Sequence, residues 1–218
     1  MRLTLVGKDP TLTQPGPRRT HGAVYERVSL FRIYEHNVIP GLLQTAAYCS
    51  AMLSFWIDFL DVPDDLDAAV AARMERQRVL HQAGKRFAVV LEEQALRTWF
   101  GTAEVQAGQL GRLLQVMSIP TVSLGIIPMM TARSAVPSAG FCIFDDSLVA
   151  LETPTASIDV TRPQEIELYA RRLTIAASRD RHLRGDGDGP FRAMMLSSVC
   201  CGAGWNACCH HARHATIS

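Results

Sequence analysis

The order of helical and strand-like segments constrains the fold of this 218-residue chain more than any other feature. Apolar segments rich in β-branched and aromatic residues, typical of strands, come mainly after the helical stretches and crowd between residues 121 and 152. The sequence predicts helices at 23–36, 42–60 and 64–83, a strand at 86–91, helices at 92–100 and 103–118, strands at 121–127, 140–144 and 148–152, and a helix at 164–177. This succession indicates an α+β fold with a small mixed or antiparallel sheet and helices packed on one side of it.

Composition excludes several classes of protein. Hydrophobic residues make up 48% of the chain and the formal net charge is only +1, so the chain is neither typical of a disordered protein nor basic enough to bind nucleic acid or an anionic membrane by charge. No apolar run approaches the ~18–20 residues of a membrane span. The apolar stretch near the start is too short for a secretory signal. We therefore expect a cytoplasmic protein that by itself binds neither a membrane nor DNA.

The two ends differ in composition from the middle. Residues 1–22 are rich in Pro and Arg and predict a flexible leader, whereas residues 23–177 carry the periodic pattern of one folded domain. From residue 178 onward the pattern is lost, and four of the six Cys fall in this part. We expect residues 178–218 to be a disordered or out-of-frame tail. Its Cys and His lack the paired C-x-x-C spacing of structural zinc sites, so no metal and no cofactor are predicted.

A series of motifs follows in a distinctive order. Glu35-His36 precedes Pro40-Gly41-Leu42-Leu43-Gln44-Thr45 and Tyr48, and Arg73-x-x-Arg76-Gln77 follows in a later helix. The series continues with Leu91–Arg97, Val122–Pro128 and Leu148–Glu152. Over residues 24–176 the chain resembles the actinobacterial domain of unknown function that lies C-terminal to the helix-turn-helix DNA-binding domain in antitoxin-like transcriptional regulators of the xenobiotic-response-element type.

The resemblance implies a regulatory domain that binds an effector or a partner, since such regulators often sit beside a small partner protein. The family's DNA-binding domain precedes the Pro-Gly-Leu-Leu-Gln-Thr motif. Here the residues before it are few and Pro-rich and hold no pair of amphipathic helices. We therefore expect this chain to lack the DNA-binding part.

An arginine and a glutamine mark one face of the predicted helix 64–83. At 100° per residue, Arg73 and Gln77 fall near the middle of its apolar face, where a charge is costly unless it is paired. Candidate partners are Glu35, Glu92 and Glu152. One interpretation is a structural ion pair or an Arg that extends past the helix end. The other is a pocket lined by Arg and Glu that holds a small molecule or a partner's side chain.

The Pro-Gly-Leu-Leu-Gln-Thr motif has two interpretations as well. Pro40 and Gly41 favour a tight turn, after which Gln44, Thr45 and Tyr48 present hydrogen-bonding groups. The motif is either a helix entry that docks the helix, or a set of backbone amides that receives an anion or a carbonyl. The complete candidate binding set is Glu35, Gly41, Gln44, Thr45, Tyr48, Arg73, Arg76, Gln77, Glu92 and Glu152.

Our functional hypothesis is a non-enzymatic regulatory domain that binds a small-molecule effector or a small partner protein, with a homodimer as a further alternative. No catalytic residue is assigned. The competing hypothesis is an enzyme acting on a small molecule, with Glu35, Glu92 or Glu152 as acid or base. A raised carboxylate pKa in a closed pocket favours the enzyme, whereas an apolar patch without a deep pocket favours the binding domain. A third hypothesis is a pseudogene product without a function of its own.

Overall fold

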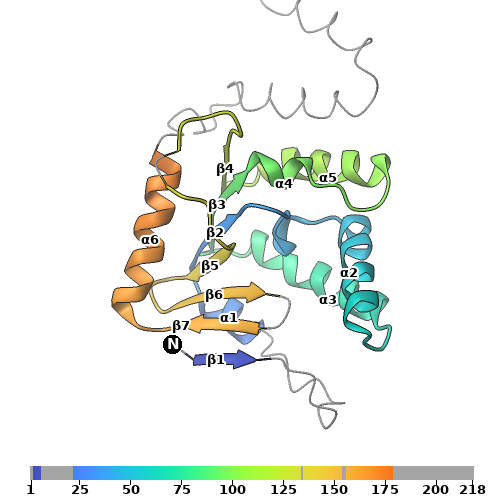
Figure 1. Ribbon diagram of the computed structural model, residues 1–218, viewed down its shortest axis with the longest axis horizontal. Helices are drawn as coiled ribbons and strands as arrows, with labels where there is room; N and C mark the ends of the chain where they lie inside the picture. The colour runs from blue at the N-terminus through green and yellow to red at the C-terminus, as the bar shows by residue number, and fades with distance from the viewer. Residues whose placement is uncertain (1, 6–21, 134, 154–155, 179–218) are drawn as a thin grey trace, which may run out of the picture.

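The computed structural model describes residues 2–5, 22–133, 135–153 and 156–178, and these form one mixed sheet with helices on both faces (Figure 1). Within them the sheet has seven strands in the order β1-β7-β6-β5-β2-β3-β4. The strands are β1 (Arg2–Leu5), β2 (Leu30–Glu35), β3 (Arg86–Glu92), β4 (Val122–Ile127), β5 (Phe141–Phe144), β6 (Leu148–Thr153) and β7 (Ala156–Val160). β2, β3 and β4 pair in parallel, and the other neighbours pair antiparallel.

Most helices lie on one face of the sheet. The α-helices are α1 (Gly22–Arg27), α2 (Ala46–Leu60), α3 (Leu66–Arg76), α4 (Glu93–Arg97), α5 (Ala103–Val116) and α6 (Pro163–Ser178), and the 3-10 helices are η1 (Gly41–Leu43) and η2 (Gln77–His81). Figure 1 shows α6 alone on one side of the sheet and α2, α3 and α5 on the other. None of these described helices is long and apolar enough to cross a membrane.

The alternation of side chains along each strand divides the core into two halves. Phe31 and Ile33 of β2 face η1, η2 and α5, together with Phe87, Leu91 and Leu113. Tyr34 of β2 and Val90 of β3 face the other way, toward Ile166 and Leu173 of α6. The central strands are therefore buried on both faces, which is typical of the parallel part of a sheet.

The predicted α+β class and mixed sheet are confirmed, with two differences. The helix predicted over 23–36 is wrong in its second half, because α1 ends at Arg27 and residues 30–35 form β2. This segment alternates between the two cores and has β3 and β5 as neighbours on either side, so its tertiary contacts select the strand. The second difference is α6, which covers the face of the sheet that was expected to be bare.

The structure contains the predicted hairpin and two strands that were not predicted. The hairpin predicted at Asp145-Asp146-Ser147 joins β5 to β6. β7 had no counterpart in the prediction, and Arg2–Leu5, expected within a flexible leader, pair with β7 as β1. The rest of the predicted leader that lies in 6–21, and the predicted tail from 179 onward, fall outside the described residues.

Candidate functional site

The Pro-Gly-Leu-Leu-Gln-Thr motif forms η1 and the start of α2. Pro40 precedes η1, and Leu42 and Leu43 are buried in the core. The Thr45 hydroxyl accepts a hydrogen bond from the backbone N–H of Tyr48 at 3.2 Å and so caps α2. The motif thus sets the direction in which the chain enters α2.

Three buried glutamines from three elements tie this turn together. Gln44 Nε2 donates to the carbonyl oxygen of Ile39 at 2.7 Å, and Gln77 Nε2 donates to the carbonyl oxygens of Gly41 at 2.9 Å and Gln44 at 2.7 Å. Gln109 accepts from the backbone N–H of Thr45 at 2.7 Å. Its Nε2 donates to the carbonyl oxygen of Leu43 at 2.8 Å. Because these polar groups are used within the chain, the geometry favours the helix-docking interpretation of the motif over the anion site.

Neither predicted arginine forms an ion pair with a candidate glutamate in the described part of the chain. Arg73 Nη1 donates to Gln44 Oε1 at 2.9 Å, and its side chain lies 3.4 Å from the point where a Cβ on Gly41 would stand. Arg76 instead places its guanidinium 5.8 Å from the centre of the Tyr25 ring. Arg73 therefore packs closely over Gly41, and Arg76 makes a cation–π contact with α1.

Glu35 and Glu152 meet at one edge of the sheet. β6 runs parallel to β2 because each is antiparallel to β5, so both residues come at the carboxyl ends of their strands. The carboxylate of Glu35 lies across Gly140, in the space that a Cβ would occupy. Only glycine fits at that position without moving Glu35.

The electrostatics of this edge favour neutral groups. Burial, and next the like charge of Glu152, raise the pKa of Glu35 from 4.5 to about 7. Burial raises the pKa of Tyr25 to about 12, and burial together with Glu35 raises the pKa of the Cys142 thiol. We call Tyr25, Glu35, Arg76, Cys142 and Glu152 the polar cluster.

Glu92 lies on the opposite face of the sheet, under α6. Its carboxylate accepts a hydrogen bond from the Tyr34 hydroxyl at 2.9 Å and forms an ion pair with Arg133 at 2.5 Å. Arg172 of α6 stacks over the Tyr34 ring at 5.1 Å. These residues line a cavity of about 20 Å³, which has room for roughly one water molecule. Glu92 is thus buried and paired, away from the polar cluster.

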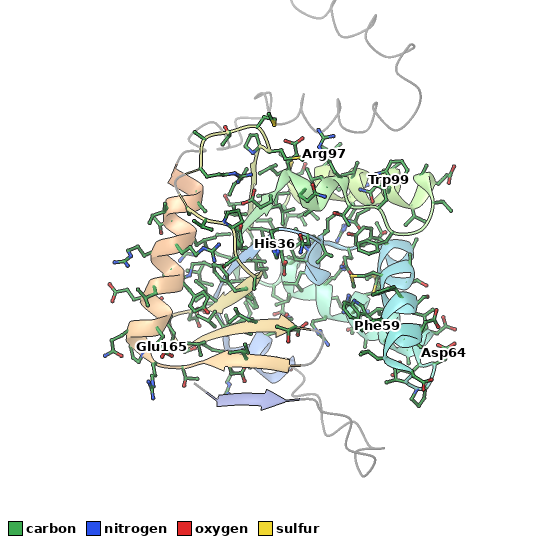
Figure 2. All side chains as sticks on the ribbon, in the orientation of Figure 1. His36, Phe59, Asp64, Arg97, Trp99 and Glu165 are labelled. Atoms are coloured by element: carbon green, nitrogen blue, oxygen red, sulfur yellow. The ribbon has the colours of Figure 1, made fainter. Side chains whose placement is uncertain are left out.

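The outward half of α2 carries an exposed aromatic surface that the sequence analysis missed. Phe55 is 52% exposed and Phe59 63% exposed, and their rings stack on each other at 5.6 Å. Trp56 contacts both rings edge-on, and Val62 just beyond the helix is 40% exposed. We call Phe55, Trp56, Phe59 and Val62 the α2 aromatic face. Figure 2 shows Phe59 and Asp64 at the end of the molecule far from Glu165 on α6.

A family model described as a domain of unknown function (DUF5753) matches residues 19–194, which is more than half of the 218-residue chain. The chain belongs to the DUF5753 family. No curated protein and no solved structure matches it significantly. The DUF5753 match includes every element from α1 to α6, so the polar cluster and the α2 aromatic face both belong to the family domain. It confirms the predicted resemblance to a domain of unknown function.

The DUF5753 structure divides the predicted binding residues into three groups. Gly41, Gln44, Thr45, Tyr48, Arg73 and Gln77 form the hydrogen-bonded turn at the start of α2 or pack against it. Glu35, Arg76 and Glu152 lie in the polar cluster, and Glu92 lies across the sheet. A usable signal for the α2 aromatic face was present in the sequence, because residues 46–60 contain one charged side chain, Asp58, and more large apolar side chains than one buried face of a helix can hold.

Proposed function

We propose that this DUF5753 domain is a regulatory binding domain that docks a partner protein on the α2 aromatic face. The observation that carries the proposal is the exposure of the stacked Phe55 and Phe59 on a strongly apolar helix whose one charged side chain is Asp58. A helix of this composition is normally buried, and a contiguous exposed apolar patch typically marks an interaction surface. The word regulatory rests on the resemblance to domains of transcriptional regulators.

The exposed rings supply part of the free energy that a specific contact needs. Fully burying a Phe side chain contributes about 1.5–3 kcal/mol, so covering the exposed parts of Phe55 and Phe59 supplies about 2–3 kcal/mol in total. Clustered aromatic side chains of this kind are typical centres of protein interfaces. The stacked rings are held by one another, so little side-chain freedom is lost when a partner covers them.

Two other candidate sites, the turn before α2 and the cavity beside Glu92, are less suited to binding than the α2 aromatic face. The polar groups of the Pro-Gly-Leu-Leu-Gln-Thr turn bond to each other and to Gln77 and Gln109, and the cavity beside Glu92 is the size of a water molecule. An apolar patch without a deep pocket is the pattern expected of a binding domain rather than of an enzyme.

The experiment is site-specific photocrosslinking followed by reconstitution. A photoreactive phenylalanine is placed at position 59 in the native host, and at position 168 on α6 as a control, because Leu168 is also an exposed apolar residue at 54%. The protein crosslinked from position 59 alone is identified and purified. We expect it to bind the wild-type chain and to bind the double variant Phe55→Ser, Phe59→Ser at least about tenfold more weakly. Equal affinity for both chains contradicts the proposal.

A second candidate function, catalysis or effector binding at the polar cluster, is favoured by the raised pKa of Glu35. A carboxyl that titrates near pH 7 suits an acid or base, and the carboxyl ends of parallel strands are common ligand positions. Native mass spectrometry against the denatured mass tests it. An additional small mass that the wild-type chain carries and Glu35→Gln lacks supports this function, and a bare native mass in both chains opposes it.

A further inference from the structure

We infer that the occupant of the α2 aromatic face is an amphipathic helix of a partner protein that carries Lys or Arg beside its apolar stripe. The inference rests on the proposed docking function and adds the chemistry of the partner. The shape of the apolar row at the end of α2 and the charge that surrounds it both point to such a partner.

The apolar row has the geometry of a helix-packing surface. Phe55 and Phe59 are spaced i and i+4 and so lie one above the other on α2, and Val62 follows just past the end of the helix, after the left-handed Asp61. The part of the row on the helix covers one turn, about 6 Å at 1.5 Å per residue. A second helix laid along such a ridge fills the grooves on either side of it, which is how helices in proteins pack. An apolar stripe of two helical turns on the partner covers it.

The surroundings of this row are strongly acidic. From residue 46 to residue 72 the chain has no Lys or Arg but five aspartates, which are Asp58, Asp61, Asp64, Asp65 and Asp67. All five are exposed, and none takes part in an ion pair within the described residues. Asp64 uses one oxygen to accept from the backbone N–H of Leu66 at 3.1 Å. The net charge of the whole chain is +1, so the acidic character is a local property of the end of the α2–α3 hairpin that holds these aspartates.

This charge decides between a second copy and a different partner. A two-fold dimer places the same patch of each subunit in one interface: with the α2 helices parallel it brings both sets of aspartates together, and with them antiparallel it gives neither set a basic partner, because residues 46–72 hold no Lys or Arg. Like charges across an interface cost several kcal/mol, whereas an opposite charge steers the encounter and fixes the register. The aspartates also lie mainly beyond Val62, at one end of the apolar row. The basic residues of the partner helix are therefore concentrated at the end that lies over the α2–α3 turn.

The test uses three designed peptides and the full chain. One is an amphipathic helix of Leu and Lys, the second keeps the same Leu stripe with Glu in place of Lys, and the third has the composition of the first with the stripe scrambled. Binding of each labelled peptide is measured by fluorescence anisotropy at low and at high salt. We expect the Leu/Lys helix to bind at least about tenfold more tightly than either of the other two, and its affinity to fall as salt rises.

Variants of the chain separate the apolar from the charged contribution. Phe55→Ser with Phe59→Ser is expected to weaken Leu/Lys binding about tenfold or more, while the matched control Leu168→Ser on α6 leaves it unchanged. Asp61→Asn with Asp64→Asn and Asp65→Asn is expected to reduce the affinity and flatten its salt dependence. These residues are exposed, and Asn tolerates the left-handed backbone of Asp61 at φ 52°, so circular dichroism should show an unchanged fold.

The outcomes distinguish the inference from the function on which it rests. Equal binding of the Leu/Glu and Leu/Lys helices, lost in the Phe55/Phe59 variant, overturns the basic partner but keeps the docking face. Leu/Lys binding that survives the Phe55/Phe59 variant is charge attraction alone and overturns both. A dimer in sedimentation velocity that forms with rising protein concentration and disappears in the same variant shows that the occupant is a second copy, and overturns the inference.

Discussion

Glu35 is the residue at which the structure and the acid–base chemistry of the chain are most closely linked. Its folded pKa of about 7 lies above its ordinary 4.5, so the folded state keeps a proton that the unfolded state releases. The stability associated with Glu35 is therefore complete below about pH 4.5 and is lost as the pH rises through about 7. We expect Glu35→Gln to remove this loss, so that the variant gains up to about 3 kcal/mol over wild type at pH 8 and little at pH 4.

Urea unfolding of both chains across this pH range measures the difference. The exposed Glu26→Gln provides the control, because its side chain faces solvent on α1. A constant difference between Glu35→Gln and wild type from pH 4 to pH 8 would show that Glu35 ionises normally in the folded protein.

Lys85 is a buried cation without a carboxylate partner among the described residues. Its Nζ donates to the carbonyl oxygens of Tyr25 at 2.7 Å, Glu26 at 2.7 Å and Val28 at 2.6 Å, at the end of α1. Lys85→Met leaves these carbonyls without their donor in a largely buried site, and we expect it to reduce the free energy of unfolding by about 2–4 kcal/mol. Chemical denaturation measures this. The control is the exposed Arg78→Met, which should change the free energy of unfolding by less than about 0.5 kcal/mol. An equal effect of the two variants would refute the role of Lys85 in holding the carbonyls at the end of α1.

At the scale of elements, α3 is attached to the body by few buried contacts. The helix itself has no buried residue, and Gln77, just after it, donates to the carbonyl oxygens of Gly41 and Gln44. We expect Gln77→Leu to reduce the free energy of unfolding by about 2 kcal/mol, because the buried carbonyl of Gln44 and the part-buried carbonyl of Gly41 lose this donor. Gln115→Leu, an exposed position on α5, is the matched control for the side-chain change. Unchanged urea midpoints in both variants would mean that this link does not hold α3.

The elements also show what local sequence can and cannot predict. Periodicity was sufficient for α2, α5, α6, β3 and the β5–β6 hairpin, because each carries its signal within its own residues. It failed for residues 30–35, whose strand conformation is selected by pairing with β3 and β5, which lie far away in the sequence. It also missed β7, a short strand that lies between β1 and β6.

For the candidate site, the sequence predicted which way a side chain faces but not its partners. The 100° spacing along the helix indicated that Gln77 faces inward, and it is 8% exposed. The partners of Arg73 and Glu92 were beyond the same reasoning, since Gln44 and Arg133 reach them only after the sheet and its loops are assembled. The meeting of Glu35 and Glu152 depends on the order of strands in the sheet, which no local pattern contains.

At the scale of the whole molecule, the two cores predict an uneven distribution of stability. β2 and β3 have a hydrogen-bonded strand on either side and buried side chains on both faces, whereas the outer half of α2 and all of α3 contribute no fully buried residue. Elements with few buried contacts open at a lower free energy than the core. Hydrogen exchange should therefore be slowest in β2 and β3 and much faster from Phe55 through α3.

The same measurement connects stability to the proposed function. A helix that docks on Phe55, Phe59 and Val62 removes this surface from water and ties the two helices together, so exchange in α2 and α3 should slow when the Leu/Lys peptide is added. Exchange in β2 and β3, which occurs through unfolding of the core, should slow by a similar factor, because unfolding of the core also releases the peptide. Equal protection of α3 and β3 in the free chain would contradict the uneven distribution, and unchanged exchange in α2 and α3 on peptide addition would contradict docking on this hairpin.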